Sequence, residues 1–310
     1  MTASKLDMGH LFCLGYGYTA QFLARYLISK NWRVSASTRS GDVSQTVEGV
    51  LLKPFETLNG EDFDSVTHIL ISIPPTADGD PVLIRNQNKF FKTSKKLRWI
   101  GYLSATSVYG DAKGLLVSET SPAKPSNNRA KYRLLAEKSW LNLCSTCQLP
   151  IHIFRLAGIY GPHRNVFQRI TTGNTQTIDE PTIKFSRIHV DDIVKVLFAS
   201  MVKPAAGQLY NVCDDKAAMQ SDVLKYAADL LQIALPRPVK LEVAKKNMSP
   251  FQESFWRDNK IVSNKKIKAD LGILLQYPTY EEGLLAIFKK RLFYTFFLLF
   301  VLIVGCHLDY

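Results

Sequence analysis

The segment Leu11–Ala20 reads LFCLGYGYTA, an apolar run followed by a Gly-x-Gly-x-x-Ala turn. The run predicts a buried parallel strand, and Gln21–Ile28 (QFLARYLI) predicts the helix after it. A turn of this kind places a pyrophosphate at a helix N-terminus, because its glycines permit the tight turn and keep side chains away from the phosphates. The alternative is that the glycines only form a tight turn. The expected dinucleotide contacts are Gly15, Gly17, Tyr18 and Thr19.

The first half of the sequence alternates short apolar runs with helical patterns. Further strands are expected at 32–37, 49–53, 67–73, 97–104 and 151–156, and helices at 81–96 and 128–143. Near-continuous apolar strands between helices are typical of a parallel sheet that is covered on both faces. The predicted fold class is therefore α/β, a Rossmann-type doubly wound parallel sheet.

The end of the second expected strand indicates which dinucleotide binds. An NAD site usually has an Asp or Glu about twenty residues after the glycines, whereas this strand ends Thr38-Arg39-Ser40 without an acid. The Arg39 guanidinium, with a hydroxyl donor on each side, fits a ribose 2′-phosphate. The alternative is a solvent-exposed arginine at a strand end. The pattern favours NADP over NAD as the cofactor.

Composition limits the partners and the compartment. The 310 residues carry a net charge of +12, which favours anionic partners, although a solvated basic surface explains it equally well. No nucleic-acid motif accompanies the charge, so nucleic acid is not an expected partner. Five scattered cysteines and the short lead before the first strand predict a cytoplasmic protein without disulfides or targeting peptide. No histidine has zinc-ligand spacing, so no metal is expected.

The C-terminal residues form a hydrophobic tail. Residues 292–306 contain no charge and follow Lys289-Lys290-Arg291. As a helix they would reach about 22 Å at 1.5 Å per residue, short of a bilayer core of about 30 Å. Membrane association through residues 292–306 and packing on the body or on a partner are both left open. The oligomeric state is open too, a homodimer included.

Further along the chain lie the phrases LSATSVYGD (103–111), RLAGIYGP (155–162), IHVDDI (188–193), NKKIKADLG (264–272) and YPTYEEGL (277–284). Together they resemble the extended short-chain dehydrogenase/reductase family, the NAD(P)-dependent epimerases and dehydratases. The glycine turn looks most like the atypical YeeZ-like branch of that family. The resemblance implies a Rossmann domain at 9–160, to which 187–215 return, and an interleaved C-terminal substrate-binding part at 161–186 and 216–290. The hydrophobic tail takes up 291–310.

The resemblance also assigns the positions of the catalysts, and this sequence departs from them. The family uses a Tyr and a Lys four residues apart on the long helix, with a Ser or Thr after the fifth strand. Aligned on Glu137, these positions hold Arg129, Arg133 and Ala105. Arginine keeps its proton near neutrality, so Arg129 cannot act as a general acid or base. At i and i+4 the two arginines share one helix face and would meet the cofactor or an anionic ligand; the alternative is pairing with surface acids.

The remaining candidates lie in these phrases or in the segments between them. The alternative for Thr106, Ser107 and Tyr109 is a core or turn role, and the alternative for His189 is that of a structural histidine. Tyr132 is a substitute proton donor without a lysine to activate it, and Arg164 begins an expected substrate loop. The catalytic candidates are Tyr132, Thr106 and Arg133. Ser72, Pro74, Arg39 and Arg133 join the glycine turn as cofactor contacts. The substrate-binding candidates are Ser107, Tyr109, Arg129, His163, Arg187 and His189.

Two main functions remain open at this stage, beside a weaker third: membrane-attached binding of nucleic acid or of a lipid surface, which the charge of +12 and the apolar tail suggest. One is an NAD(P)-dependent oxidoreductase or epimerase that acts on an anionic small molecule, for which the resemblance implies a nucleotide-sugar. The other is a non-catalytic NADP-binding sensor or regulatory protein that has lost the catalytic tetrad. Whether the protein is an enzyme is therefore not decided by the sequence.

Overall fold

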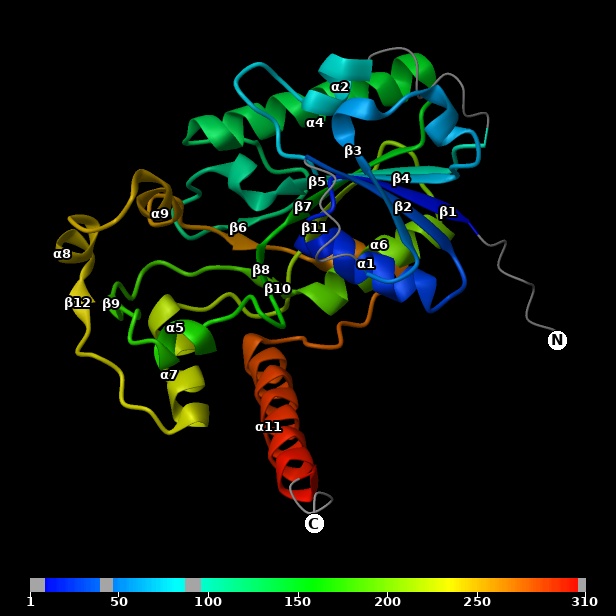
Figure 1. Ribbon diagram of the computed structural model, residues 1–310. Helices are drawn as coiled ribbons and strands as arrows, with labels where there is room; N and C mark the ends of the chain where they lie inside the picture. Colours follow the sequence, from blue (N-terminus) through cyan, green and yellow to red (C-terminus); the bar gives the residue numbers. More distant parts are fainter. Residues whose placement is uncertain (1–8, 40–46, 87–95, 306–310) are drawn as a thin grey trace.

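The computed structural model describes residues 9–39, 47–86 and 96–305. Seven strands form one parallel sheet in the order β11-β7-β5-β4-β1-β2-β3 (Figure 1). The chain runs outward from β1 to β3 and returns to β4 on the other side of β1, which creates a switch point between β1 and β4. This order confirms the predicted Rossmann-type α/β fold. The strands are β1 (His10–Leu14), β2 (Arg33–Thr38), β3 (Val50–Pro54), β4 (His68–Ile71), β5 (Trp99–Ala105), β7 (Ile151–Leu156) and β11 (Leu209–Val212).

Helices cover both faces of this sheet (Figure 1). One face packs against α1 (Tyr18–Ile28) and α6 (Val190–Val202), and the other packs against α2 (Pro81–Asn86) and α4 (Asn128–Cys147). All five residues of β1 are buried, as a strand covered on both faces requires. The helix expected at 81–96 is present over Pro81–Asn86, and its residues 87–95 lie outside the described residues. Ser40 and Cys306, which also belong to predicted segments, lie outside them as well.

The turn between β1 and α1 depends on glycine. Gly15 has φ +94°, and a Cβ atom there would lie 2.7 Å from Ser72 Oγ. Gly17 is the N-cap of α1, has an extended backbone and has no side-chain cap. A Cβ atom at Gly17 would meet nothing within 4 Å. The turn therefore leaves open space in front of the first N–H groups of α1.

A smaller part of the chain lies beside the sheet and is interleaved with it. Its last strand, β13 (Ile261–Val262), pairs with β6 (Leu116–Val117), which comes from the loop after β5. Residues far apart in the sequence thus meet at one edge of the sheet (Figure 1). The other elements are β8 (Gly158–Tyr160), α5 (Phe167–Thr171), β9 (Ile178–Asp179), β10 (Arg187–His189), α7 (Gln220–Leu231), β12 (Val239–Lys240), α8 (Leu241–Lys245), α9 (Pro250–Phe255) and α10 (Lys265–Leu271).

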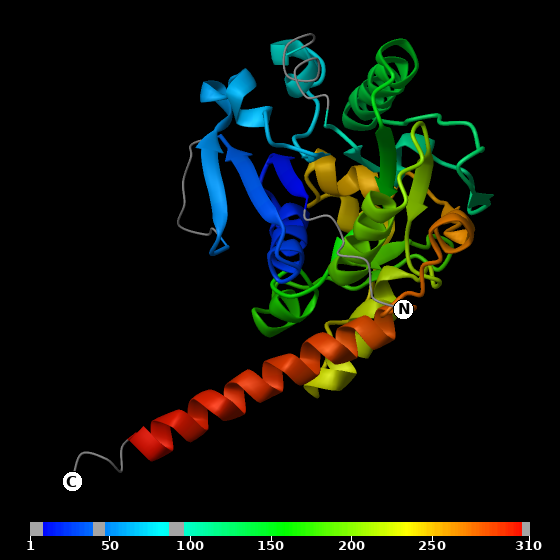
Figure 2. The ribbon, with the colours of Figure 1, turned by 90° about the vertical axis from the view of Figure 1, so that its right-hand side faces the viewer.

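The C-terminal helix α11 (Tyr280–Gly305) begins against this smaller part and then leaves the body (Figures 1 and 2). Tyr280, Leu284 and Ile287 are buried in one cluster with α7. Beyond these turns the helix extends away from the rest of the protein. Within the described ranges, no helix combines the length and the apolar character that crossing a membrane requires.

Candidate active site

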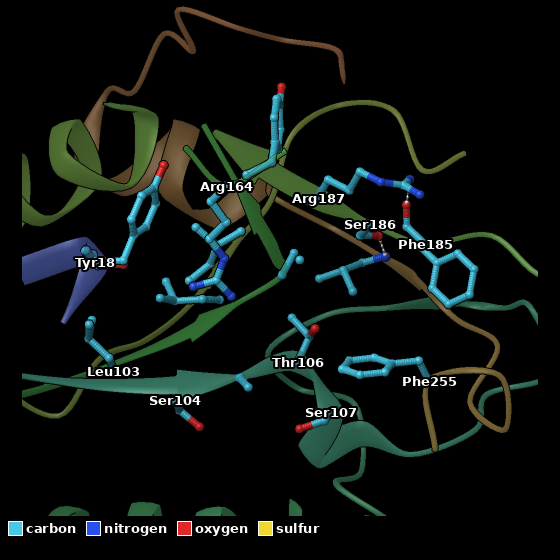
Figure 3. A pocket seen from close by; sticks show the side chains of 18 of the residues that line it. Tyr18, Leu103, Ser104, Thr106, Ser107, Arg164, Phe185, Ser186, Arg187 and Phe255 are labelled. Carbon is cyan, nitrogen blue, oxygen red and sulfur yellow. Dashed lines mark hydrogen bonds between the residues drawn. The ribbon is translucent and has the colours of Figure 1, made fainter. Parts of the chain in front are cut away.

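A cavity of about 880 Å³ opens between the sheet and the smaller part (Figure 3). Its walls include the first turn of α1, the ends of β4 and β5, the first turns of α4, and the segments 184–187 and 254–262. The cavity therefore begins at the carboxyl edge of the strands, where ligands bind in open α/β sheets. It continues into the smaller part of the chain.

The N-terminus of α1 forms one end of the cavity. Gly17, Tyr18 and Thr19 line it, and no side chain caps the first N–H groups of the helix. Uncapped N–H groups and the positive end of the helix dipole bind phosphate. The Tyr18 hydroxyl donates a hydrogen bond to the Pro162 carbonyl (2.8 Å), and the Arg164 guanidinium lies 5.5 Å from the Tyr18 ring centroid. This end has the donors and the open space that a pyrophosphate needs.

The other expected cofactor contacts surround this end. Ser72 and Pro74 line the cavity after β4. Gly15 lies behind it, and its carbonyl accepts a hydrogen bond from Ser72 Oγ (2.9 Å). Arg39 is exposed just beyond the end of β2 and is not among the described residues that line the cavity. The structure therefore does not place Arg39 with the other expected cofactor contacts in the cavity lining.

The first turns of α4 bring both expected arginines to the cavity. Asn127 caps this helix by accepting a hydrogen bond from the Ala130 N–H (3.0 Å). Arg129 and Arg133, one turn apart, both line the cavity. Arg133 Nη1 also donates to the Leu103 carbonyl (2.6 Å), which fixes this guanidinium at the end of β5. The end of β5 thus carries a permanent positive charge that is held in place by a backbone carbonyl.

Thr106 and Ser107 line the cavity next to these arginines, as does Ala105. They begin the short helix η3 (Thr106–Tyr109) after β5. Two residues expected beside them are placed elsewhere. Tyr132 is not among the cavity-lining residues, and Tyr109 is only 2% exposed.

Tyr109 is part of a buried network rather than a ligand contact. Its hydroxyl donates to Asn211 Oδ1 (2.8 Å), and the Arg155 guanidinium lies 4.7 Å from its ring centroid. Arg155 Nη2 also lies 2.7 Å from Glu137 Oε2, and Ser104 Oγ donates to the same carboxylate. Glu137 and Arg155 both stand out in the sequence, but their spacing alone does not show that α4 and β7 place them in direct contact.

The two histidines expected at the substrate are also outside the cavity lining. His163 is exposed, with φ +59°, and its neighbour Arg164 faces the cavity instead. His189 is 1% exposed and caps α6, because its Nδ1 accepts the Asp191 N–H (3.2 Å). Burial, with a smaller contribution from Lys290, lowers the pKa of His189 to about 4, so the ring is neutral. The described contacts of His189 are therefore structural.

The lining of the cavity is cationic as a whole. Arg187 is part of it, and its Nη1 donates to the carbonyls of Phe185 (2.8 Å) and Ala218 (3.0 Å). Burial lowers the pKa of Arg187 from its ordinary value, although nearby Asp214 opposes this. The described lining contains one carboxylate, Asp258, against seven cationic side chains. These cations are Arg129, Arg133, Arg164, Arg169, Lys184, Arg187 and Lys260.

Sequence reasoning missed several of these groups. Lys184, Asp258 and Lys260 lie in irregular segments and Arg169 lies on the short helix α5, so no periodic pattern in the sequence indicates which of these side chains turn inward. A second hollow of about 490 Å³ adjoins the cavity and shares Arg169 and Arg187 with it. The only signal available beforehand was the surplus of positive charge, which does not say where the charge gathers.

Comparisons with known proteins agree with this geometry. The model of the NAD dependent epimerase/dehydratase family matches residues 91–213. Protein YeeZ from Escherichia coli K12 is 27% identical over 282 residues, which cover 86% of this chain and 95% of YeeZ. A solved structure of a functionally unknown conserved protein from Silicibacter pomeroyi is 41% identical, with a TM-score of 0.86, and covers 91% of this chain and 99% of its own.

A more distant structure has the same fold. The dTDP-glucose 4,6-dehydratase from Bacillus anthracis, solved in complex with NAD, has a TM-score of 0.74 at 17% identity and covers 91% of this chain and 96% of its own. At that identity the likeness concerns the fold alone. Over residues 91–213 the chain is thus similar to the NAD dependent epimerase/dehydratase family, on a parallel sheet of Rossmann-type strand order.

Proposed function

We propose that the protein is an NADP-dependent oxidoreductase or epimerase that acts on an anionic small molecule of the nucleotide-sugar type. One observation carries the proposal: the same cavity contains the uncapped N-terminus of α1 and seven cationic side chains in its lining. The first feature fits a dinucleotide pyrophosphate. The second fits a ligand with several negative charges.

The residues present fit a nicotinamide dinucleotide. The open space at Gly17 lets phosphates approach the N–H groups of α1. Arg133 supplies a fixed charge where β5 ends, and Arg39 supplies a guanidinium at the end of β2. When bound, the dinucleotide would give or accept a hydride. The chain itself supplies the phosphate cradle, the charge that orients an anionic ligand, and the cavity in which both lie.

The nucleotide-sugar part of the proposal rests on family and charge. Family relatives are nucleotide-sugar enzymes, such as the dTDP-glucose dehydratase and the UDP-glucuronic acid 4-epimerase from Bacillus cereus. A diphosphate linkage would match a wall that includes Arg164, Arg169 and Arg187. Arginine in such a wall binds phosphate oxygens in a bidentate manner.

The cofactor is tested by thermal unfolding with NADPH and with NADH. We expect NADPH to raise the melting temperature more, because Arg39 pairs with the 2′-phosphate, and we expect Arg39→Asp to remove the difference. Arg33→Asp, at the opposite end of the same strand and also exposed, is the matched control and should keep it. Equal stabilisation of the unmutated protein by both cofactors would overturn the assignment of NADP.

A second candidate function is a non-catalytic NADP-binding sensor. It is favoured by Arg129 and Arg133, which occupy the positions that the family alignment assigns to Tyr and Lys and which both line the cavity. A crystal structure with NADPH separates the two functions. Contact of these arginines with the nicotinamide supports an enzyme, whereas contact with phosphates only supports a sensor.

A further inference from the structure

Asp258 and Lys260 form a buried charged pair in the wall of the cavity. Lys260 Nζ lies 3.6 Å from Asp258 Oδ2, and the two side chains are only 11% and 6% exposed. Asp258 Oδ1 is buried and has no hydrogen-bond partner among the described residues. An ion pair taken out of water without full hydrogen bonding is costly to keep. A pair of this kind that faces a ligand cavity is therefore a candidate for chemistry.

The fold ties this pair to the segment that follows β5 and η3. Between the two residues, the Asn259 carbonyl accepts hydrogen bonds from the N–H groups of Ala112 (3.0 Å) and Gly114 (2.9 Å), in the segment after η3. Strand β13 then pairs with β6 directly after Lys260. The pair is thus tied to the loop that follows Thr106 and Ser107. These two residues line the same cavity as Asp258 and Lys260.

Lys184 also lines the cavity, but its side chain is exposed to solvent, unlike that of Lys260. The arginines, tyrosines and hydroxyl groups of the wall are poorly suited to moving protons near neutrality. Arg129 and Arg133 keep their protons. Burial raises the pKa of the Tyr18 and Tyr160 hydroxyls, which already donate to the carbonyls of Pro162 and Thr279. Thr106 and Ser107 need a base to activate them.

We propose that Lys260, positioned by Asp258, exchanges a proton with an oxygen atom of the ligand bound in this cavity. The inference rests on the proposed function and names the proton carrier that the family's Tyr-Lys pair would otherwise supply. Lys260 is the residue that meets the ligand. Asp258 acts through Lys260 and is a positioning residue.

The electrostatics of Lys260 agree with this role. Burial lowers the pKa of Lys260 below the ordinary lysine value. The two carboxylates that act on it, Asp258 and Asp111, raise the pKa again but do not cancel the effect of burial. Proton exchange is fastest for a group whose pKa approaches the working pH. The cationic side chains that share the wall, Lys184 and the arginines named above, favour an anionic ligand there.

The proposed step moves one proton. When a ligand carbonyl is reduced, an N–H bond of the Lys260 ammonium breaks and an O–H bond forms on the ligand oxygen. The carbon of that carbonyl gains the hydride that a reduced nicotinamide dinucleotide supplies, and Lys260 is left as the neutral amine. In the oxidation direction the neutral amine takes the hydroxyl proton. Water at the mouth of the cavity restores the resting protonation of Lys260.

Pyridoxal 5′-phosphate is a direct probe of this lysine. Its aldehyde condenses with a neutral amine to an imine, with loss of water, and borohydride reduces the imine to a stable secondary amine. The probe's phosphate also fits the cationic wall. The full chain, with and without NADP⁺, is labelled over a range of pH, and the modified lysines are mapped by mass spectrometry. The labelling of two further lysines is measured in the same samples as an internal control. They are Lys184, which lines the same cavity, and Lys131, which is exposed on α4.

We expect Lys260 to reach half-maximal labelling at a lower pH than Lys131. Asp258→Asn should move that midpoint lower still, because a carboxylate that favours the ammonium is lost; each pKa unit corresponds to about a tenfold change in the neutral fraction. Lys260→Arg should abolish this label, and Lys184→Arg should keep it. The melting temperature of each variant shows that it is folded.

Two results would overturn the proposal: labelling of Lys184 without Lys260, or the same midpoint for Lys260 and Lys131. If Asp258→Asn leaves the labelling midpoint of Lys260 unchanged, Asp258 does not act on Lys260 as proposed. The labelling needs no turnover and no choice between NADPH and NADH. Failure of the proposed function would therefore appear in the thermal experiment, and failure of this inference would appear in the labelling.

Discussion

Glu137→Gln should destabilise the protein strongly although it changes neither the shape of the side chain nor the cavity lining. The Glu137 carboxylate is 1% exposed and accepts hydrogen bonds from Arg155 Nε (3.1 and 3.2 Å), from Arg155 Nη2 (2.7 Å) and from Ser104 Oγ. The amide removes the negative charge and leaves the Arg155 cation buried without a counterion. Removing one partner of a buried pair costs about 3–5 kcal/mol. Because glutamine fills the same space, we expect the lower end, about 3 kcal/mol.

Equilibrium urea unfolding measures this loss as a lower midpoint at an unchanged m-value. Glu253→Gln is the matched control, because Glu253 pairs with Arg257 at 3.1 Å on the surface, where both side chains are partly exposed. That pair should contribute less than about 1 kcal/mol. Replacing Glu137 and Arg155 together by methionine should recover most of the loss. If Glu137→Gln costs no more than the control, the buried pair does not stabilise the fold as described.

Gly15→Ala should lower the free energy of unfolding by about 1–3 kcal/mol, since φ is +94° and the new methyl would meet Ser72 Oγ. Gly17→Ala should leave the free energy of unfolding in urea nearly unchanged but weaken NADPH binding, measured as a smaller thermal shift. A larger loss of stability for Gly17→Ala than for Gly15→Ala would contradict the geometry of the turn. Burial lowers the pKa of His152 to about 4, against about 6.5 unfolded. Stability should thus fall as the pH drops through this window, by up to about 1.4 kcal/mol per pH unit for this residue. His152→Gln should make the free energy of unfolding less dependent on pH in this range. An unchanged slope would mean that His152 does not contribute to the pH dependence.

The sheet and the two arginines of α4 were accessible from the sequence. Parallel strands that are covered on both faces must be apolar throughout, so each one stands out as a short apolar run between helices. Spacing on a helix is equally definite. Arg129 and Arg133 are four residues apart on a long helix, and both line the cavity. For strands and for side chains on one helix face, the local sequence pattern is therefore enough to predict the arrangement.

Tyr109 and His189 show where that kind of reasoning ends. Both belong to motifs, and both are buried in packing that other segments complete: Arg155 lies over the Tyr109 ring, and Tyr277 lies 4.1 Å from the His189 ring, centroid to centroid. Asp258 and Lys260 show the converse. They lie in a segment without a pattern and are turned into the cavity by β13 pairing with a strand about 145 residues earlier, at Val117 and Val262. Contacts of such long range are not visible in local spacing.

The interleaving of the smaller part sets the order in which the cavity can form during synthesis. The glycine turn and the end of β4 belong to the first 76 residues, but the wall that carries Lys260 arrives only when Val262 pairs with Val117. A chain still emerging from the ribosome would have a phosphate end without the opposite wall. A ligand that contacts both halves stabilises only the finished chain. Resistance to proteolysis in its presence would therefore mark the completion of folding.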